Sequence, residues 1–491
     1  MGLVKGSTLQ GVGGTRLALA LQILLIGALA VLLGLISSTA NPLLIALAVG
    51  SIGGIFLLAN PRLIVWIVLV AGLAGGALVS LAGAQFSKLP WGVVILSFLL
   101  WGPVLFSLMK GTRPPGFIML LFAFTVLAVV SSLIQMHSFG EFIAGFKRYF
   151  QAYGLLLALA LIPFASKDVK QWLTASAVIA VVQLPFALYE RLVLVPLRGG
   201  LESGKAEVTD VVAGTFGANM EGGSPNSLMV AYLLFAIAFA YMRWREGLLP
   251  GWKTILFAIP CFIPLFLGET KIVLVLVPLI LLVLHRKEAF SRPAIFLFVT
   301  LMGAGLVTLF AFVYAELMWH RPLTDVVEET IAYNFLHKGH GHAFLNRTTV
   351  LLFWWQKQSL ADPVGFLLGH GIGSAYTGVM SFSVGHIAAT YLGYGIDLTT
   401  LSLLLWEVGV IGLALHLAIF FMAWKAAGRL ARSARDPAVR ADAMSIQAAI
   451  AVFLLFHYYT NSIISLLSGE LMIAVVLGYL GYLVRTAEVS K

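Results

Sequence analysis

Apolar segments long enough to cross a bilayer recur along almost the whole chain, separated by short polar stretches. A transmembrane helix needs about 20 apolar residues, and of the 491 residues here 60% are hydrophobic and only 11% charged. The pattern predicts an all-α integral membrane protein with about 14 transmembrane helices, or 12 at the fewest, in a single polytopic domain over residues 1–491. The candidate spans are residues 16–37, 43–59, 63–84, 91–109, 116–135, 150–165, 172–190, 227–243, 254–269, 272–284, 294–317, 398–424, 442–463 and 465–484.

Basic residues are concentrated in the short loops on one side of the predicted membrane. Lys and Arg in short loops are retained in the cytoplasm, so we expect both termini there. The longer loops, residues 136–149, 191–226 and 318–397, then face outward. This bias explains the net charge of +10, so no nucleic-acid partner is expected. The single cysteine, Cys261, permits no intrachain disulfide.

One of the outer segments, "SFGEFIAGFKRYF", has the pattern of an amphipathic helix in the membrane interface. Apolar residues recur at spacings of three and four, while Glu141, Lys147 and Arg148 lie elsewhere on the helix. The helix is either a connector whose cations contact lipid headgroups, or a site where Lys147 or Arg148 holds a lipid-linked phosphate. The apolar positions are Phe139, Phe142, Ile143, Phe146 and Phe150.

A second outer segment, "GFLLGHGIGSAYTGVMSFSVGH", residues 365–386, contains six glycines and two histidines. Such a stretch is too flexible for a regular helix and too polar to face lipid. A glycine-rich backbone, here at Gly371 and Gly373, can approach a sugar or phosphate closely. We therefore expect a substrate cradle, although either histidine alone could be a structural residue.

Four motifs in order resemble the O-antigen ligase and O-antigen polymerase superfamily over roughly residues 210–420. They are "AGTFGANMEGGSPNSLMVAYLLF", "LGETKIVLVLVPLI", "NRTTVLLFWWQKQSLADPVGFLLGHGIGSA" and "LSLLLWEVGVIGLAL". The family's serine-arginine turn is Thr270-Lys271 here. Ligases carry a histidine-asparagine pair before the last motif, where this chain has "GIDLTTL" with Asp397. The second difference favours a polymerase over a ligase.

The resemblance implies a glycosyltransferase of the bacterial cytoplasmic (inner) membrane, with its active site facing the periplasm. Its donor would be an oligosaccharide repeat unit linked to undecaprenyl diphosphate and embedded in the lipid bilayer, and its acceptor another glycan. The transfer would be metal-independent and need no cofactor. Chain-length regulator and flippase proteins are the partners that the resemblance suggests.

This chemistry makes two demands on the residues of the outer face. Cations must bind the leaving diphosphate, and a general base must accept the proton of the attacking hydroxyl. The candidate bases are His386, Asp397 and His370. The candidate cations are Lys271, Arg347, Arg191, Lys147 and Arg148. Lys271, in a tight turn between two spans, is the best placed of these, although it could also be a lysine that snorkels to the interface.

Three alternatives stay open. The histidines of "HKGHGH", His337, His340 and His342, are spaced like metal ligands but lack a clear fourth ligand. A ligase would move the glycan to lipid A-core or another acceptor. A flippase for lipid-linked oligosaccharides could have the same number of spans, although it would place polar groups at mid-membrane.

Glu407 is expected to cap a helix or pair within the bundle.

Overall fold

The computed structural model describes most of the chain. The chain divides into two compact units, Met1–Leu63 and Ile64–Lys491; nearly all described residues belong to the second, whose fold follows. The described residues are 27, 31, 34, 60–82, 86, 89–135, 137–197, 211–218, 225–268, 270–294, 297–298, 301, 305, 309, 312, 322–336, 339, 343–358, 360, 362–377 and 384–489.

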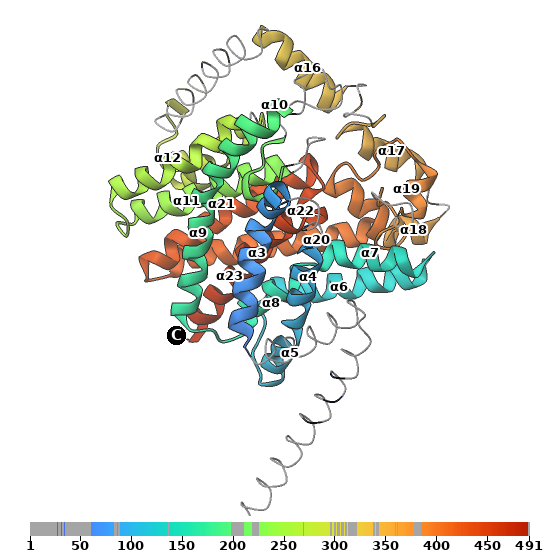
Figure 1. The fold of residues 1–491 in the computed structure, drawn as a ribbon, viewed down its shortest axis with the longest axis horizontal. Helices are drawn as coiled ribbons and strands as arrows, with labels where there is room; N and C mark the ends of the chain where they lie inside the picture. Colours follow the sequence, from blue (N-terminus) through green and yellow to red (C-terminus); the bar gives the residue numbers. More distant parts are fainter. Residues whose placement is uncertain are drawn as a thin grey trace, which may run out of the picture. The chain divides into compact units, whose positions relative to one another are not determined.

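The secondary structure of this part of the chain is helical, without a strand (Figure 1). The helices are α3 (Pro61–Ala82), α4 (Leu89–Leu99), α5 (Trp101–Met109), α6 (Gly116–Ile134), α7 (Phe139–Phe150), α8 (Tyr153–Leu161), α9 (Ser166–Tyr189), η2 (Glu190–Leu194), α10 (Val195–Leu197), η5 (Gly214–Phe216), α11 (Pro225–Arg245), α12 (Gly251–Leu267), α13 (Val273–Leu284), α14 (Arg286–Ser291), α16 (Leu323–Phe335), α17 (Thr349–Lys357), α18 (Pro363–Leu368), α19 (His386–Thr390), α20 (Thr400–Ser433), α21 (Pro437–Tyr459), α22 (Ser462–Ser465) and α23 (Leu467–Val489).

Eight helical segments among the described residues are long and apolar enough to cross a membrane. They match eight of the expected spans, so the prediction of an all-helical, multi-pass membrane protein is confirmed at this level. The segments are Pro61–Leu81, Leu89–Met109, Gly116–Ile134, Ser166–Leu197, Pro225–Arg245, Thr400–Ser433, Pro437–Tyr459 and Leu467–Ala487.

Three of the other expected spans do not reach this length. α8 has 9 residues, α12 has 17 and α13 has 12, where the sequence pattern predicted spans at 150–165, 254–269 and 272–284. The expected spans at 16–37, 43–59 and 294–317 lie largely outside the described residues. The expected total of about 14 is therefore not shown.

The short helix α8 is enclosed on all sides. Each of its residues is buried, and it packs against α4, α5 and α23. A helix that is apolar around its whole circumference belongs in the interior of a bundle. Because α8 follows α7 after only two residues, it anchors the C-terminal end of α7, which carries Arg148, to the core.

Two antiparallel helices, α20 and α21, define the two ends of the bundle. At one end the Thr400 N–H donates to the Thr460 carbonyl at 3.2 Å, next to α22. At the other end the Arg243 guanidinium, at the C-terminus of α11, donates two 2.9 Å hydrogen bonds to Asp442 near the start of α21. The basic loop between α20 and α21 is thus separated from Thr400 by the full length of α20.

The expected amphipathic helix is present as α7, and its polar face is turned inward. Glu141 and Arg148 are 7% and 3% exposed, whereas Phe139 and Ile143 are 70% and 41% exposed. An outward-facing phenylalanine and isoleucine suit a lipid environment rather than water, whereas Phe150 of the same expected apolar set is buried. Short helices of the expected outer loop, α17 and α18, pack against α20, and α19 meets α7 through its first residue, His386.

Candidate functional site

Residues 369–377, here called the glycine loop, dock onto α20 where that helix is broken. The N–H groups of His370 and Gly371 donate to the carbonyls of Trp406 and Glu407 at 2.8 and 3.0 Å. These carbonyls are within reach because Gly409 interrupts the helix with a φ of 65°. A Cβ at Gly409 would lie 2.4 Å from the Leu367 carbonyl oxygen, so this position requires glycine.

The opposite side of the glycine loop contacts α6 and α7. The Ile372 N–H donates to Ser132 Oγ at 3.0 Å. Gly373 has a φ of 93°, and a Cβ there would lie 2.3 Å from the Glu141 carbonyl oxygen. Gly371, with a φ of 89°, lies against Ser132. The structure thus gives both glycines a packing reason, while their contact with a substrate stays a prediction.

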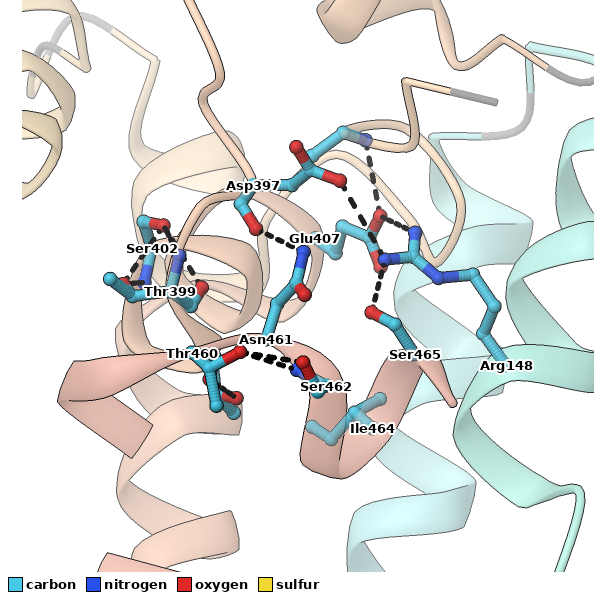
Figure 2. A network of polar contacts seen from close by, with 12 residues as sticks. Arg148, Asp397, Thr399, Ser402, Glu407, Thr460, Asn461, Ser462, Ile464 and Ser465 are labelled. Carbon is cyan, nitrogen blue, oxygen red and sulfur yellow. Dashed lines mark hydrogen bonds and ion pairs between the residues drawn. The ribbon is translucent and has the colours of Figure 1, made fainter. Parts of the chain in front are cut away.

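Arg148 of α7 lies between two carboxylates under the glycine loop (Figure 2). Its guanidinium is 3.8 Å from Asp397 Oδ2 and 3.8 Å from Glu407 Oε1, and it donates a 2.9 Å hydrogen bond to Ser465 Oγ. The Tyr376 ring covers it, with 4.3 Å between Arg148 Cζ and the ring centroid. One cation therefore joins α7, the segment before α20, α20 itself and α22.

Glu407 has a second role at this point, since its Oε1 accepts a 3.1 Å hydrogen bond from the Ala375 N–H. Glu407 is fully buried. Glu407 and Gly409 together explain the "E-x-G" sequence. The Glu407 carboxylate holds the glycine loop and Arg148, and Gly409 interrupts α20 so that the loop can dock there. The expectation that Glu407 pairs within the bundle agrees with this arrangement.

Asp397 is 8% exposed and rigidly placed. Its carbonyl oxygen accepts a 2.5 Å hydrogen bond from Asn461 Nδ2. Two residues later, Thr399 and Ser402 form a reciprocal capping box at the start of α20 (Figure 2). Burial raises the pKa of the Asp397 carboxyl, and the charge of Arg148 opposes this effect.

The second candidate base, His386, is held by Glu141 of α7. His386 Nδ1 lies 2.9 Å from Glu141 Oε1, and the His386 N–H donates to Glu141 Oε2 at 3.1 Å. The His386 side chain is 24% exposed, and the His137 ring stacks on it at 4.8 Å between centroids. His386 is thus oriented by a buried carboxylate and remains partly exposed.

His370, the third candidate base, lies beside His386 with 6.3 Å between ring centroids. Its Nε2 is 2.9 Å from Gln358 Oε1. Burial lowers the pKa of the His370 imidazole; the charge of Asp362 opposes this, and His386 adds to it. The structure therefore brings two of the three candidate bases side by side.

The two pairs, Glu141 with His386 and Arg148 with Asp397, are related through α7. Glu141 and Arg148 are seven residues apart and both buried on its inward face, about 10 Å apart along the helix axis at 1.5 Å per residue. Through Glu141 and Arg148, α7 thus holds the His386 imidazole and the Asp397 carboxylate at two positions along the glycine loop.

The candidate cations occupy different surroundings. Lys147 lies over the Trp91 ring at 5.4 Å, and burial lowers the pKa of its ammonium, with the charge of Glu470 opposing. Arg347 donates 2.6 Å hydrogen bonds to the Tyr459 carbonyl and to Asn334 Oδ1. Their roles in phosphate binding stay predictions.

Lys271 and Arg191 each follow, in the sequence, a residue of a second set of polar contacts, which involves η2, α11 and the turn before α13. Next to Lys271, Thr270 Oγ1 hydrogen-bonds to Asn226 Oδ1. Next to Arg191, the Glu190 carboxylate accepts from the N–H groups of Ala213 and Gly214 at 2.8 and 2.6 Å. Asn226 of "PN" thus meets the turn of the second motif, while "GTF" begins at a residue held by Glu190.

No metal site is found in the described part of the chain, where no three His, Cys, Asp or Glu side chains form a group able to hold an ion. His337, His340 and His342 lie outside the described residues.

Sequence reasoning missed the partners of the candidate bases. Glu141 follows Ser138 by three residues, a spacing typical of a helix-capping box, and Ser138 Oγ does accept from the Glu141 N–H. The Glu141 side chain, however, is directed to His386. No sequence pattern singled out Tyr376 or Ser465, because only the folding of the chain brings them to Arg148.

No protein-family model matches this chain, and no curated protein matches it.

Proposed function

We propose that this chain is a membrane glycosyltransferase that polymerises undecaprenyl-diphosphate-linked oligosaccharide repeat units on the outer face of the bacterial cytoplasmic membrane. The observation that carries the proposal is the meeting of the motif residues around one loop. Glycine-loop residues, Asp397 and Glu407 gather at Arg148, and His386 of α19 packs against the same face of α7. Such a cluster at the end of a bundle suits an enzyme better than a transporter.

The distribution of charge supports the outer location. The cluster lies at the end of α20 that begins with Thr400, whereas Arg429, Arg432 and Arg435 lie at or just beyond its other end. Retention of basic loops in the cytoplasm places the second end inside. The candidate site then faces the periplasm, where lipid-linked repeat units are available after export.

The reaction requires one bond to form as another breaks. The acceptor hydroxyl oxygen attacks the anomeric carbon of the donor, its proton passes to a base, and the carbon–oxygen bond to the diphosphate breaks. We assign the base to His386 Nε2, because the His386 side chain is partly exposed while the Asp397 carboxylate is buried against Arg148. The diphosphate leaves as an anion stabilised by the candidate cations.

Purified protein in nanodiscs, given a lipid-linked repeat unit, tests the proposal. Products longer than one repeat unit are expected from the wild type, and His386→Ala should lower the rate about 100-fold or more while donor binding changes little. His285→Gln is the matched control, since His285 contacts Tyr241 and Glu288 near the basic loops. Glycan found only on a different acceptor means a ligase, and absence of any transfer overturns the proposal.

A further inference from the structure

Glu141 has a geometry that a helix-capping role leaves unexplained. We propose that it is a positioning residue that fixes the tautomer of His386, leaving Nε2 as the proton acceptor. The inference about the tautomer stands on the geometry, and its use in proton transfer rests on the proposed function.

The Glu141 carboxylate contacts His386 through both of its oxygens. One oxygen, Oε2, accepts from the His386 backbone N–H at 3.1 Å, and the other, Oε1, faces His386 Nδ1 at 2.9 Å. An ionised carboxylate can only accept hydrogen bonds. His386 Nδ1 must therefore carry a hydrogen, and in the neutral ring the lone pair is then on Nε2.

The position of Glu141 is itself fixed. Its side chain is 8% exposed, its N–H is bonded to Ser138 Oγ at 3.1 Å, and its carbonyl oxygen lies against Gly373. His386 opens α19, so its N–H has no partner within that helix, and Glu141 supplies one. A carboxylate this constrained restricts both the position and the rotation of the imidazole.

The other neighbours of the ring leave the same nitrogen available. His137 stacks face to face on His386, and His370 meets it edge to face. Neither arrangement is a hydrogen bond, and among the described residues only Glu141 hydrogen-bonds to the His386 ring. Nε2 is thus the nitrogen left to meet an acceptor hydroxyl.

Two substitutions separate tautomer control from simple tethering of α19. Glu141→Gln has nearly the same shape but offers one acceptor oxygen and one NH₂ group. If the oxygen replaces Oε2, which lies 3.1 Å from both the His386 backbone N and Nδ1, the NH₂ group replaces Oε1 at 2.9 Å from Nδ1 and favours the ring hydrogen on Nε2. Glu141→Asp keeps both acceptors on a shorter side chain. Ser138→Ala serves as the control, because it removes the helix cap and leaves the carboxylate in place.

The first measurement is nitrogen-15 NMR of histidine-labelled protein in lipid, which reports tautomers without any substrate. The His386 signals are identified, among those of the ten histidines, by their loss in His386→Gln. Hydrogen on Nδ1 is expected in the wild type, in Ser138→Ala and in Glu141→Asp, and on Nε2 in Glu141→Gln. The same Nδ1–H signal in Glu141→Gln, or an Nε2–H signal in the wild type, overturns the inference.

The second measurement is chain elongation. Glu141→Gln is expected to lower kcat about 100-fold with KM changed less than about threefold, because the loss falls on the proton transfer, and Glu141→Asp should recover part of it. A full-rate Glu141→Gln enzyme contradicts the positioning role. A wild type without transferase activity refutes the proposed function, while the NMR result still decides the tautomer.

Discussion

Glu141 and Arg148 lie on the same buried face of α7, two helical turns apart, and each binds a residue from a segment more than 200 positions away in the sequence. Glu141 holds His386, and Arg148 holds Asp397 together with Glu407. The helix that carries them follows from apolar spacing alone, but its inward face includes both of these charged residues.

Removal of the Arg148 guanidinium should destabilise the fold. Arg148→Met leaves Asp397 and Glu407 buried without their cation, and the loss of one partner from a buried ion pair costs about 3–5 kcal/mol. Thermal unfolding in nanodiscs measures the effect. Arg148→Met with Asp397→Asn should recover part of the loss, because it removes one of the uncompensated charges. An unchanged unfolding temperature in Arg148→Met would show that the two carboxylates need no cation.

Gly409→Ala should release the glycine loop from α20. The substitution forces an L residue into a φ of 65° and puts a Cβ 2.4 Å from the Leu367 carbonyl oxygen, which costs at least about 1–3 kcal/mol. Proteolysis of the loop should become faster. The matched control is Gly92→Ala in α4, where a Cβ meets nothing within 4 Å and stability should be unchanged or higher by up to about 1 kcal/mol. Equal behaviour of the two variants would contradict the docking role.

The stability of the wild type should fall in mild acid through His370. Burial holds the pKa of this imidazole below its ordinary value of 6.5, so the unfolded chain binds more protons than the folded one below that pH. The resulting stability is present above pH 6.5 and is lost as the pH falls below it. His370→Gln should reduce the change in unfolding temperature between pH 7.5 and pH 5. These values are chosen to bracket the ordinary imidazole pKa of about 6.5. Parallel curves for the two proteins would exclude His370 as the source.

Lys271 should contribute to donor binding. Lys271→Ala is expected to weaken binding of the lipid-linked donor about 10-fold or more, since a charge-assisted contact contributes about 1.5–3 kcal/mol. Lys271→Arg should retain more affinity because it keeps the charge. The donor KM in the elongation assay measures both. An unchanged KM in Lys271→Ala would return this residue to the role of a lysine that snorkels to the interface.

The orientation in the membrane can be tested directly. Cys261 is buried and is first replaced by serine. In this background an impermeant thiol reagent added to intact cells should label Ala389→Cys, at the exposed end of α19, and not Ser433→Cys, at the exposed end of α20. The reverse pattern would place the candidate site in the cytoplasm and remove the basis of the proposed reaction.

Much of the fold could be predicted from the sequence because lipid imposes simple rules on composition. The spans matched by α6, α11 and α20 stand out by hydropathy alone, and α7 by its apolar spacing. The short α8 was predicted as a span of 150–165, since an apolar run does not show whether a helix crosses the membrane or ends inside the bundle.

The candidate site was harder to predict from the sequence, because its contacts join distant segments. His386 and Asp397 were singled out by residue type, but Glu141 lies 245 positions from His386, and its spacing from Ser138 favours a local cap. Likewise, the "E-x-G" sequence at Glu407 was visible as a pattern. Its purpose depends on a positive φ at Gly409 and on the backbone of a loop that precedes α20, neither of which periodicity reveals.

The contacts of Arg148 also imply an order of assembly during synthesis. Ser465, which accepts its hydrogen bond, is made 317 residues later, on the order of tens of seconds at ordinary translation rates. An unpaired arginine is costly within the hydrocarbon layer, and α7 is not among the spanning helices. The guanidinium can therefore remain hydrated at the bilayer surface, and the nascent chain closes the site only when its last helices are inserted.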